Sequence, residues 1–248
     1  MILLKSTQEI AKMEVANRIV AEILAEVKEH IRPGVETREL DEVAEEACRR
    51  CRVKPAFKGY RGYPRSVCVS VNEEVVHGIP GARRLKDGDL VSLDFGVQHD
   101  GYFGDAALSV GVGEISLQAR RLMQATEESL YAGIARCKVG GRLSDISHAV
   151  QTVVEKYGFS VIRDFVGHGI GRSLHEDPQL PNFGPEGRGP KLQAGLTLAI
   201  EPMVSAGGWQ VRILGDGWTA VTQDGSLAAH FEHTVALTEA GPLIMSRV

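Results

Sequence analysis

Apolar residues recur at helical spacing in two separate pairs of segments. The first helix is predicted to start at Ser6-Thr7-Gln8-Glu9, which resembles a capping box, and to end before Pro33-Gly34. Thr37 is expected to cap the second helix, which runs toward Cys51. The second helix pair is predicted at roughly residues 116–137 and 144–157.

Between and after these pairs, the pattern changes to the short apolar runs that are typical of β-strands. Residues 66–72 predict one strand, and residues 93–107 predict a hairpin with apolar runs on both sides of a His-Asp-Gly turn signal. Strands dominate again from Leu196 onward. The order of a helix pair followed by strands therefore occurs twice, which indicates an internal repeat.

The similarity of two short segments of the sequence supports this repeat. LKDGDLVSLD (85–94) and LQAGLTLAIE (192–201) share a leading leucine, a glycine at the fourth position and a carboxylate at the tenth. Asp94 and Glu201 are therefore expected at equivalent places in two half-repeats. The chain is predicted to form one domain, residues 1–248, with half-repeats at roughly 6–115 and 116–240.

The amino-acid composition mainly excludes some classes of protein. The chain has 248 residues, 43% of them hydrophobic, with 28 basic and 32 acidic side chains and a net charge of −4. Proteins that bind nucleic acid usually carry a basic excess, so specific nucleic-acid binding is not expected. The apolar run at the N-terminus is too short for a signal peptide, and no segment approaches a membrane span. These features predict a soluble cytoplasmic protein with no membrane partner.

The four cysteines fit a reducing compartment better than a disulfide framework. Cys48 and Cys51 form a single C-x-x-C motif without a second pair, which is a weak zinc signal. Both belong to the predicted helix that starts at Thr37, so we expect them to face the core.

The hairpin at residues 93–107 carries two acidic residues on one face. If His99-Asp100 forms the two-residue turn, Asp94 lies directly opposite Asp105, and if Asp100-Gly101 forms it, the two are diagonal neighbours. Two carboxylates at roughly 4 Å, with an effective dielectric constant of about 20, repel each other by about 4 kcal/mol. A positive charge between them is therefore expected.

Two further strand acids and a glycine-flanked histidine point to the same centre. Glu232, like Glu201, interrupts a run that is otherwise suited to a half-buried strand, and His168 lies among glycines. One shared proton can serve two acids but not four, so a metal centre is predicted. The donor set of Asp94, Asp105, His168, Glu201 and Glu232 suits Mn²⁺, Fe²⁺, Co²⁺ or Zn²⁺. Its charge of about −4 balances two divalent ions, with one Asp and one Glu bridging them.

The sequence resembles a known family, the type I methionine aminopeptidases of the pita-bread metallopeptidase fold. The resemblance covers practically the whole chain, in its short bacterial form. The motifs that carry it occur in the expected order: PAFKGYRGYP, NEEVVHGIPG, LDFGVQHDGYFGDAA, GHGIGRSLHEDP, IEPMV and FEHT. The resemblance implies an α+β fold in which helix pairs pack on a curved antiparallel sheet with pseudo-twofold symmetry. It also implies that the five residues above are the ligands of two metal ions, with Asp105 and Glu232 bridging.

The same resemblance supplies roles for other residues. Glu201 would act as a general base as well as a ligand, His175 would stabilise the oxyanion, and His77 would contact the peptide backbone and assist the leaving amine. Three positions depart from the best-known pattern: Phe57 where Cys is frequent, Leu174 where Phe is frequent, and Arg61 where His is frequent. The methionine side chain would lie against Phe57, Tyr60, Tyr63, Cys68, Leu174 and Trp218.

The resemblance implies a cytosolic, monomeric exopeptidase that removes the initiator methionine from nascent polypeptides when the second residue is small. The basic residues Arg83, Arg84 and Lys86 are either a solvated cluster or a transient contact with the ribosome. An alternative is an Xaa-Pro aminopeptidase or dipeptidase of the same fold, whose members usually carry an additional N-terminal domain. A non-catalytic pita-bread binding module is the third reading, although such modules have lost metal ligands that this chain retains.

Overall fold

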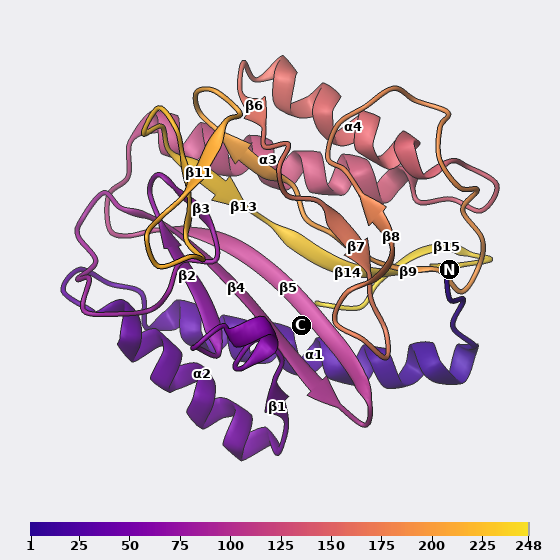
Figure 1. Cartoon of the computed structure of the whole chain (residues 1–248), viewed down its shortest axis with the longest axis horizontal. Coiled ribbons are helices and arrows are strands. Elements are labelled where there is room, and N and C mark those ends of the chain that lie inside the picture. The colour runs from indigo at the N-terminus through magenta and orange to yellow at the C-terminus, as the bar shows by residue number, and fades with distance from the viewer. Residues whose placement is uncertain (248) are drawn as a thin grey trace.

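The computed structural model describes residues 1–247, in which a helix pair followed by strands occurs twice (Figure 1). The helices are α1 Thr7–Glu29, α2 Thr37–Cys51, α3 Leu117–Arg136 and α4 Leu143–Lys156, with a short 3-10 helix, η1 Tyr60–Gly62. The strands are β1 Lys54–Pro55, β2 Val67–Val71, β3 Glu74–Val76, β4 Leu90–His99, β5 Tyr102–Gly111, β6 Ser160–Val161, β7 Gly167–Gly169, β8 Glu176–Leu180, β9 Thr197–Ile200, β10 Met203–Ser205, β11 Val211–Ile213, β12 Ala220–Thr222, β13 Ala228–His230, β14 Glu232–Thr238 and β15 Gly241–Ile244.

The helix ends follow the predicted caps with one exception. Ser6 caps α1 in a capping box, because its side chain accepts the backbone N–H of Glu9 while the Glu9 carboxylate accepts that of Ser6. The prediction that Thr37 caps α2 was wrong. Glu36 is the cap, and its backbone N–H donates to the Glu39 carboxylate at 2.7 Å. The Thr37 hydroxyl instead donates to the carbonyl of Gly81, so it ties the helix start to a distant loop.

The antiparallel sheet that contains most of the strands has the strand order β1-β4-β5-β14-β9-β7-β8. β2 pairs with β4 and β15 pairs with β14 outside this path. Strands from the two halves of the sequence meet where β5 pairs with β14. Two smaller antiparallel sheets, β13-β10-β6 and β11-β12-β3, complete the strand layer.

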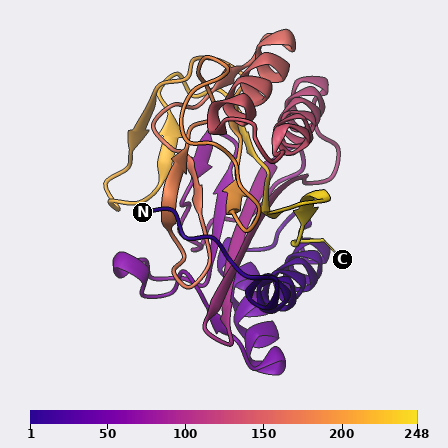
Figure 2. The ribbon, with the colours of Figure 1, turned by 90° about the vertical axis from the view of Figure 1, so that its right-hand side faces the viewer.

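The four α-helices lie together on one side of this strand layer (Figure 2). α1 and α2 bury their apolar faces against β2, β4 and β5, and the core under them includes Val20, Leu40 and Phe95. Leu130 of α3 and Ile146 of α4 belong to a second core cluster that includes residues of β9 and β14. Within residues 1–247, none of the helices has the length and apolarity that a bilayer span requires. The opposite side of the sheet carries only the short helix η1 among the described helices, and its residues Tyr60 and Arg61 line the pocket there.

The C-x-x-C motif does not act as a unit. Cys48 is buried in the core, but Cys51 is exposed, so the expectation that both face the core was wrong for Cys51. Cys51 is the last residue of α2, and the chain leaves the helix at Arg52 in a left-handed conformation.

Candidate metal centre

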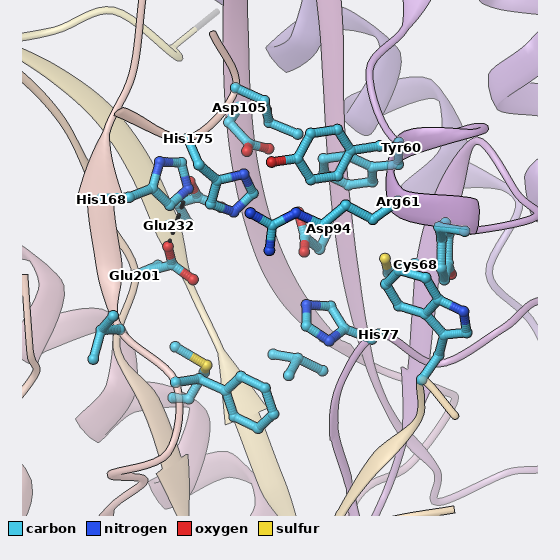
Figure 3. Close-up of a pocket in the computed structure, with 18 residues that line it drawn as sticks. Tyr60, Arg61, Cys68, His77, Asp94, Asp105, His168, His175, Glu201 and Glu232 are labelled. Carbon is cyan, nitrogen blue, oxygen red and sulfur yellow. Dashed lines mark ion pairs between the residues drawn. The ribbon is translucent and has the colours of Figure 1, made fainter. Parts of the chain in front are cut away.

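Five neighbouring strands bring the five predicted ligands to one pocket. Asp94 lies on β4, Asp105 on β5, Glu232 on β14 and His168 on β7, while Glu201 directly follows β9. These strands are adjacent in the sheet, in the order β4-β5-β14-β9-β7. The labelled side chains point toward one another across the pocket (Figure 3). The site therefore requires both halves of the chain.

The hairpin register fixes the two aspartates. His99 pairs with Tyr102, so Asp100-Gly101 forms the turn, and both of these residues have positive φ, 47° and 79°. Of the two predicted registers, the diagonal one is therefore confirmed: Asp94 lies opposite Ala107, and Asp105 lies opposite Gly96. A Cβ atom at Gly96 would lie 3.2 Å from Oδ1 of Asp105, so glycine there leaves room for the carboxylate.

The same register carries across the sheet. Glu232 lies opposite Ala107, which pairs with Asp94 on its other side, so the two acids flank one small residue. Glu201 follows the strand on the far side of β14. His168 lies opposite the residue two positions before Glu201, which places both on one face. Alternation along each strand therefore turns all five side chains to the same side.

The chemistry of this donor set fits a divalent cation. Asp105, His168 and Glu232 are buried and offer one ligand atom each within 4.8 Å of one another. Oδ1 of Asp94, Oδ1 of Asp105 and Oε1 of Glu232 have no hydrogen-bond partner among residues 1–247. Buried carboxylate oxygens without partners cost stability, and a metal ion supplies the missing interaction.

Burial and mutual repulsion both disfavour the ionised carboxylates. Burial raises the pKa of Asp94 to about 7. Burial, followed by repulsion from Asp94, raises the pKa of Asp105 and of Glu201 well above its usual range. The pKa of Glu232 is raised in the same way by burial and then by Asp105 and Glu201. Without a cation, the cluster therefore holds protons that a bound ion would displace.

His168 is oriented by its own backbone. Its Nδ1 donates to the carbonyl of Gly169 at 2.9 Å, because a carbonyl oxygen can only accept. The lone pair therefore resides on Nε2, which lies 3.4 Å from Oε1 of Glu201. Burial lowers the pKa of His168 to about 4, so the ring is neutral near pH 7. A neutral imidazole held in one tautomer is the form that binds a metal.

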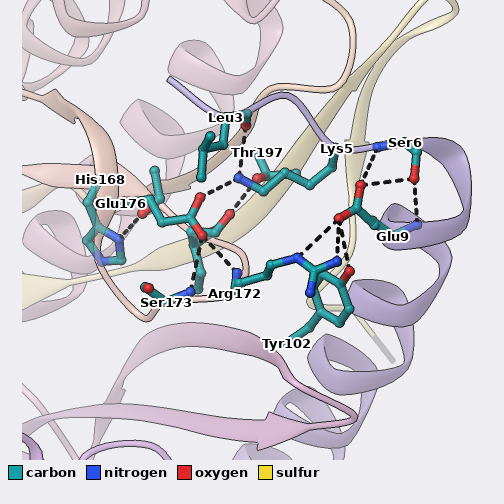
Figure 4. A network of polar contacts seen from close by, with 12 residues as sticks. Leu3, Lys5, Ser6, Glu9, Tyr102, His168, Arg172, Ser173, Glu176 and Thr197 are labelled. Atoms are coloured by element: carbon teal, nitrogen blue, oxygen red, sulfur yellow. Dashed lines mark hydrogen bonds and ion pairs between the residues drawn. The ribbon is translucent and has the colours of Figure 1, made fainter. Parts of the chain in front are cut away.

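The loop that carries His175 is tied to the N-terminal segment (Figure 4). The Glu176 carboxylate accepts the backbone N–H groups of Arg172 and Ser173 and pairs with the Lys5 ammonium. Both members of this ion pair are buried, with 5% of the Lys5 side chain and 7% of the Glu176 side chain exposed. This network fixes the turn immediately before β8 and thereby the position of His175.

His175 itself lies at the mouth of the pocket. Its ring stacks on Tyr60, with ring centroids 5.3 Å apart, and lies 4.1 Å from the ring of His168. Burial, followed by the electrostatic effect of His168 and then of Arg61, lowers the pKa of His175 to about 3. The neutral ring keeps one N–H donor for a ligand in the pocket.

His77 lies across the pocket from His175 (Figure 3). Its backbone is in the left-handed region, with φ 61°, which is uncommon for a residue other than glycine. Its ring meets Phe165 and Trp218 edge to face, with centroids 5.4 and 6.2 Å apart. Burial lowers the pKa of His77 below its usual value.

The pocket continues from the acids into an apolar part. Cys68 pairs with Asp94 across β2 and β4, so it joins the two parts. Tyr63 donates its hydroxyl to the carbonyl of Gly78 at 2.9 Å and meets Trp218 edge to face at 5.2 Å. The structure brings all the predicted site residues to this one pocket: Phe57, Tyr60, Tyr63, Cys68, His77, Asp94, Asp105, His168, Leu174, His175, Glu201, Trp218 and Glu232.

Sequence reasoning missed several residues of the site. Val76, Phe165, Val166 and Met203 also line the pocket. Apolar residues in strands or loops carry no signal that separates a pocket wall from a core. His230 was also missed, although its spacing of two residues from Glu232 predicts the same side of an extended chain.

Comparison with known proteins shows which family this chain resembles. The model of metallopeptidase family M24 matches residues 11–239. Methionine aminopeptidase 1 of Bacillus subtilis is 54% identical over 248 residues, which is 100% of both chains. The crystal structure of methionine aminopeptidase from Thermotoga maritima matches with a TM-score of 0.98 and 51% identity over 100% of both chains. Prolidase from Pyrococcus horikoshii shares the fold, with a TM-score of 0.81 at 20% identity, and is covered to 63% of its length.

These similarities confirm the predicted family resemblance and the predicted α+β pita-bread fold. The roles of the individual site residues and the division into half-repeats remain predictions.

The raised pKa values predict how stability depends on pH in the metal-free protein. From about pH 7 to about pH 8 the unfolded carboxyl groups are ionised, whereas the buried cluster still holds protons, so stability falls as pH rises. Below about pH 6.5 the unfolded chain binds protons at the histidines whose pKa values are lowered in the folded protein, so stability falls as pH falls. The interval from about pH 7 to about pH 8 lies above the range of this opposite effect.

Calorimetry with a chelator should therefore give a lower Tm at pH 8 than at pH 7. Glu232→Gln removes one of the four carboxyl groups and should reduce this difference. A Tm of the metal-free protein that stays constant or rises over this interval would contradict the electrostatic description of the site.

Proposed function

The chain belongs to metallopeptidase family M24, and on that premise we propose that it removes the N-terminal methionine from polypeptides whose second residue is small. The observation that carries this proposal is the full-length similarity to bacterial methionine aminopeptidases, combined with five ligand-type side chains on one face of the sheet. The substrate is a peptide or nascent chain, and we place the reaction in the cytoplasm.

Two divalent ions, of Mn²⁺, Fe²⁺, Co²⁺ or Zn²⁺, are proposed to bind Asp94, Asp105, His168, Glu201 and Glu232. Asp105 and Glu232, which lie on the central strands β5 and β14, are the proposed bridging ligands. The charge of four ionised carboxylates matches that of two divalent ions, and burial makes this balance necessary. When bound, such a pair supplies an activated water and polarises the carbonyl of the first peptide bond.

The protein side chains then divide the remaining work. Glu201 takes the proton of the attacking water, a role open to a carboxylate beside the reacting groups. His175 donates its N–H to the carbonyl oxygen of the substrate, where negative charge develops. His77 contacts the peptide backbone and assists the departing amine. Asp94 is the proposed partner of the free α-amine, which explains why the cleft accepts a chain end.

The apolar part of the pocket is proposed to hold the methionine side chain. Phe57, Leu174 and Cys68 are nearly fully buried there, with 8%, 2% and 3% exposure, and Tyr63 and Trp218 form an aromatic wall. Phe57 and Leu174 differ from the familiar pattern in opposite senses of size, so they offset each other in volume. Arg61 lies over the ring of Tyr60 at 5.4 Å, at the side where residues after the methionine would lie.

We further propose that the chain acts as a monomer and that contact with the ribosome, if it forms, is transient. Arg83 and Arg84 are held in ion pairs with Glu74 and Glu36 of the same chain. These ion pairs favour the interpretation that the basic cluster is a solvated part of the surface and not a dedicated binding site for the ribosome.

The direct test is hydrolysis of Met-Ala-Ser and Met-Leu-Ser after addition of Mn²⁺ or Co²⁺. We expect methionine to be released from Met-Ala-Ser and much more slowly from Met-Leu-Ser. Equal release from both would disprove the requirement for a small second residue. Release from neither, with cleavage of an Xaa-Pro peptide instead, would favour the prolidase-type activity.

His175→Ala should lower turnover by about 10²–10³-fold, because it removes one donor to the developing oxyanion. Its metal content, measured by atomic emission, should equal that of the unaltered protein. His148→Ala is the matched control, since His148 is an exposed histidine on α4 and should leave turnover unchanged. Loss of metal in His175→Ala would show that this histidine is a ligand.

Asp105→Asn should reduce the metal content from two ions per chain to fewer. A neutral amide cannot balance two cations, and Asp105 is the proposed bridging ligand on β5. The same measurement on Asp100→Asn, an exposed turn residue, provides a control for the amide substitution. Two ions bound to Asp105→Asn with unchanged affinity would exclude it as a bridging ligand.

A further inference from the structure

His230 is a buried histidine whose side chain has no hydrogen-bond partner. It lies at the end of β13, and only 1% of it is exposed. Neither Nδ1 nor Nε2 forms a hydrogen bond among residues 1–247. By contrast, His168 and His233 each use Nδ1, with Gly169 and Ser246 as partners. Native proteins keep few buried polar atoms without partners, so this imidazole requires an explanation.

The backbone of His230 is held firmly in place. Its N–H donates to Oγ of Ser109, and the Ser109 hydroxyl donates to its carbonyl, both at 2.9 Å. β13 also pairs with β10, where His230 lies opposite Met203, a residue of the pocket wall. The strand pairing therefore fixes the backbone of His230, and its ring lies beside Glu201.

The carboxylate of Glu201 lies close to the ring of His230. Nε2 of His230 lies 3.9 Å from Oε2 of Glu201, while Oε1 of the same carboxylate lies 3.4 Å from Nε2 of His168. Glu201 is thus placed between two imidazoles, with one oxygen facing each. Of the two histidines, His168 belongs to the predicted ligand set and His230 does not. Oε2 of Glu201 is the oxygen that faces His230.

We propose that His230 is a positioning residue for Glu201: its Nε2–H donates to Oε2 and holds Oε1 toward the metal site. This inference rests on the proposed metal centre. A separation of 3.9 Å is longer than a hydrogen bond, so the proposed bond requires the carboxylate to turn toward the ring. Carboxylate ligands generally need such an outer partner, whose loss weakens metal binding by about 10–100-fold.

A second histidine, close to His230 in the sequence, provides a matched control. His233 lies in β14, three residues after His230, so alternation turns it to the other side of the chain. Its Nδ1 is bonded to Oγ of Ser246 at 2.8 Å, and its Nε2 lies 3.3 Å from the hydroxyl of Tyr131. His230 is buried and His233 is partly buried, and of the two it is His230 that faces Glu201.

The test is a titration of the metal-free protein with Mn²⁺, by calorimetry or by competition with a chelating dye, combined with the Tm before metal is added. His230→Leu should bind Mn²⁺ about 10–100-fold more weakly, while its metal-free Tm stays the same or rises because an unpaired polar group is removed. His230→Gln keeps an N–H donor and should retain most of the affinity. His233→Leu should lower the metal-free Tm and leave the affinity unchanged.

The outcomes separate this inference from the proposed function. If the unaltered protein binds no Mn²⁺, the metal centre itself is wrong. If the unaltered protein binds Mn²⁺ and His230→Leu binds it equally well, or if the Leu and Gln variants lose affinity alike, His230 does not position Glu201. Loss of one of the ions from His230→Leu at saturating Mn²⁺ would make His230 a ligand and would also overturn the proposal. If leucine prevents folding, His230→Ala takes its place, because it likewise supplies no donor.

Discussion

Repulsion among four carboxylates in one pocket is the constraint on which the rest of the structure depends. Asp94, Asp105, Glu201 and Glu232 face a common space, and burial raises the pKa of each of them. Such a cluster is stable only when protons or cations balance its charge. A divalent centre is the balance that also explains the neutral, backbone-oriented His168 and the carboxylate oxygens without partners.

The fold can be understood as the means of assembling these groups. Each of five adjacent strands supplies one of them, and the antiparallel register places them on the same face. The four α-helices lie together on the other side of the strand layer, which leaves this face to the pocket (Figure 2). Loops and short strands then add the histidines and the apolar wall. The methionine aminopeptidase activity that we propose uses both parts: the acids at one end of the pocket and the apolar wall at the other.

The sequence predicted the site better than it predicted several local details. Asp94 and Asp105 could be placed on one face because strand periodicity is two, whichever turn formed, and the similarity of the segments that end at Asp94 and Glu201 brought in the second half of the chain. The turn at Asp100-Gly101 could not be chosen in advance, since both registers keep the aspartates on one face. The cap of α2 was misassigned because Thr37 bonds to Gly81, a contact between distant parts of the sequence. His230 was missed for a related reason: its lack of partners is visible only in three dimensions.

The two halves of the chain are proposed to hold two divalent ions together, through five side chains from neighbouring strands. Anomalous diffraction from crystals grown with Mn²⁺, recorded on both sides of the manganese absorption edge, tests this directly. We predict two manganese peaks in the pocket, both in contact with Asp105 and Glu232, with Asp94, His168 and Glu201 completing the coordination. A single peak, or peaks that avoid these residues, would contradict the account.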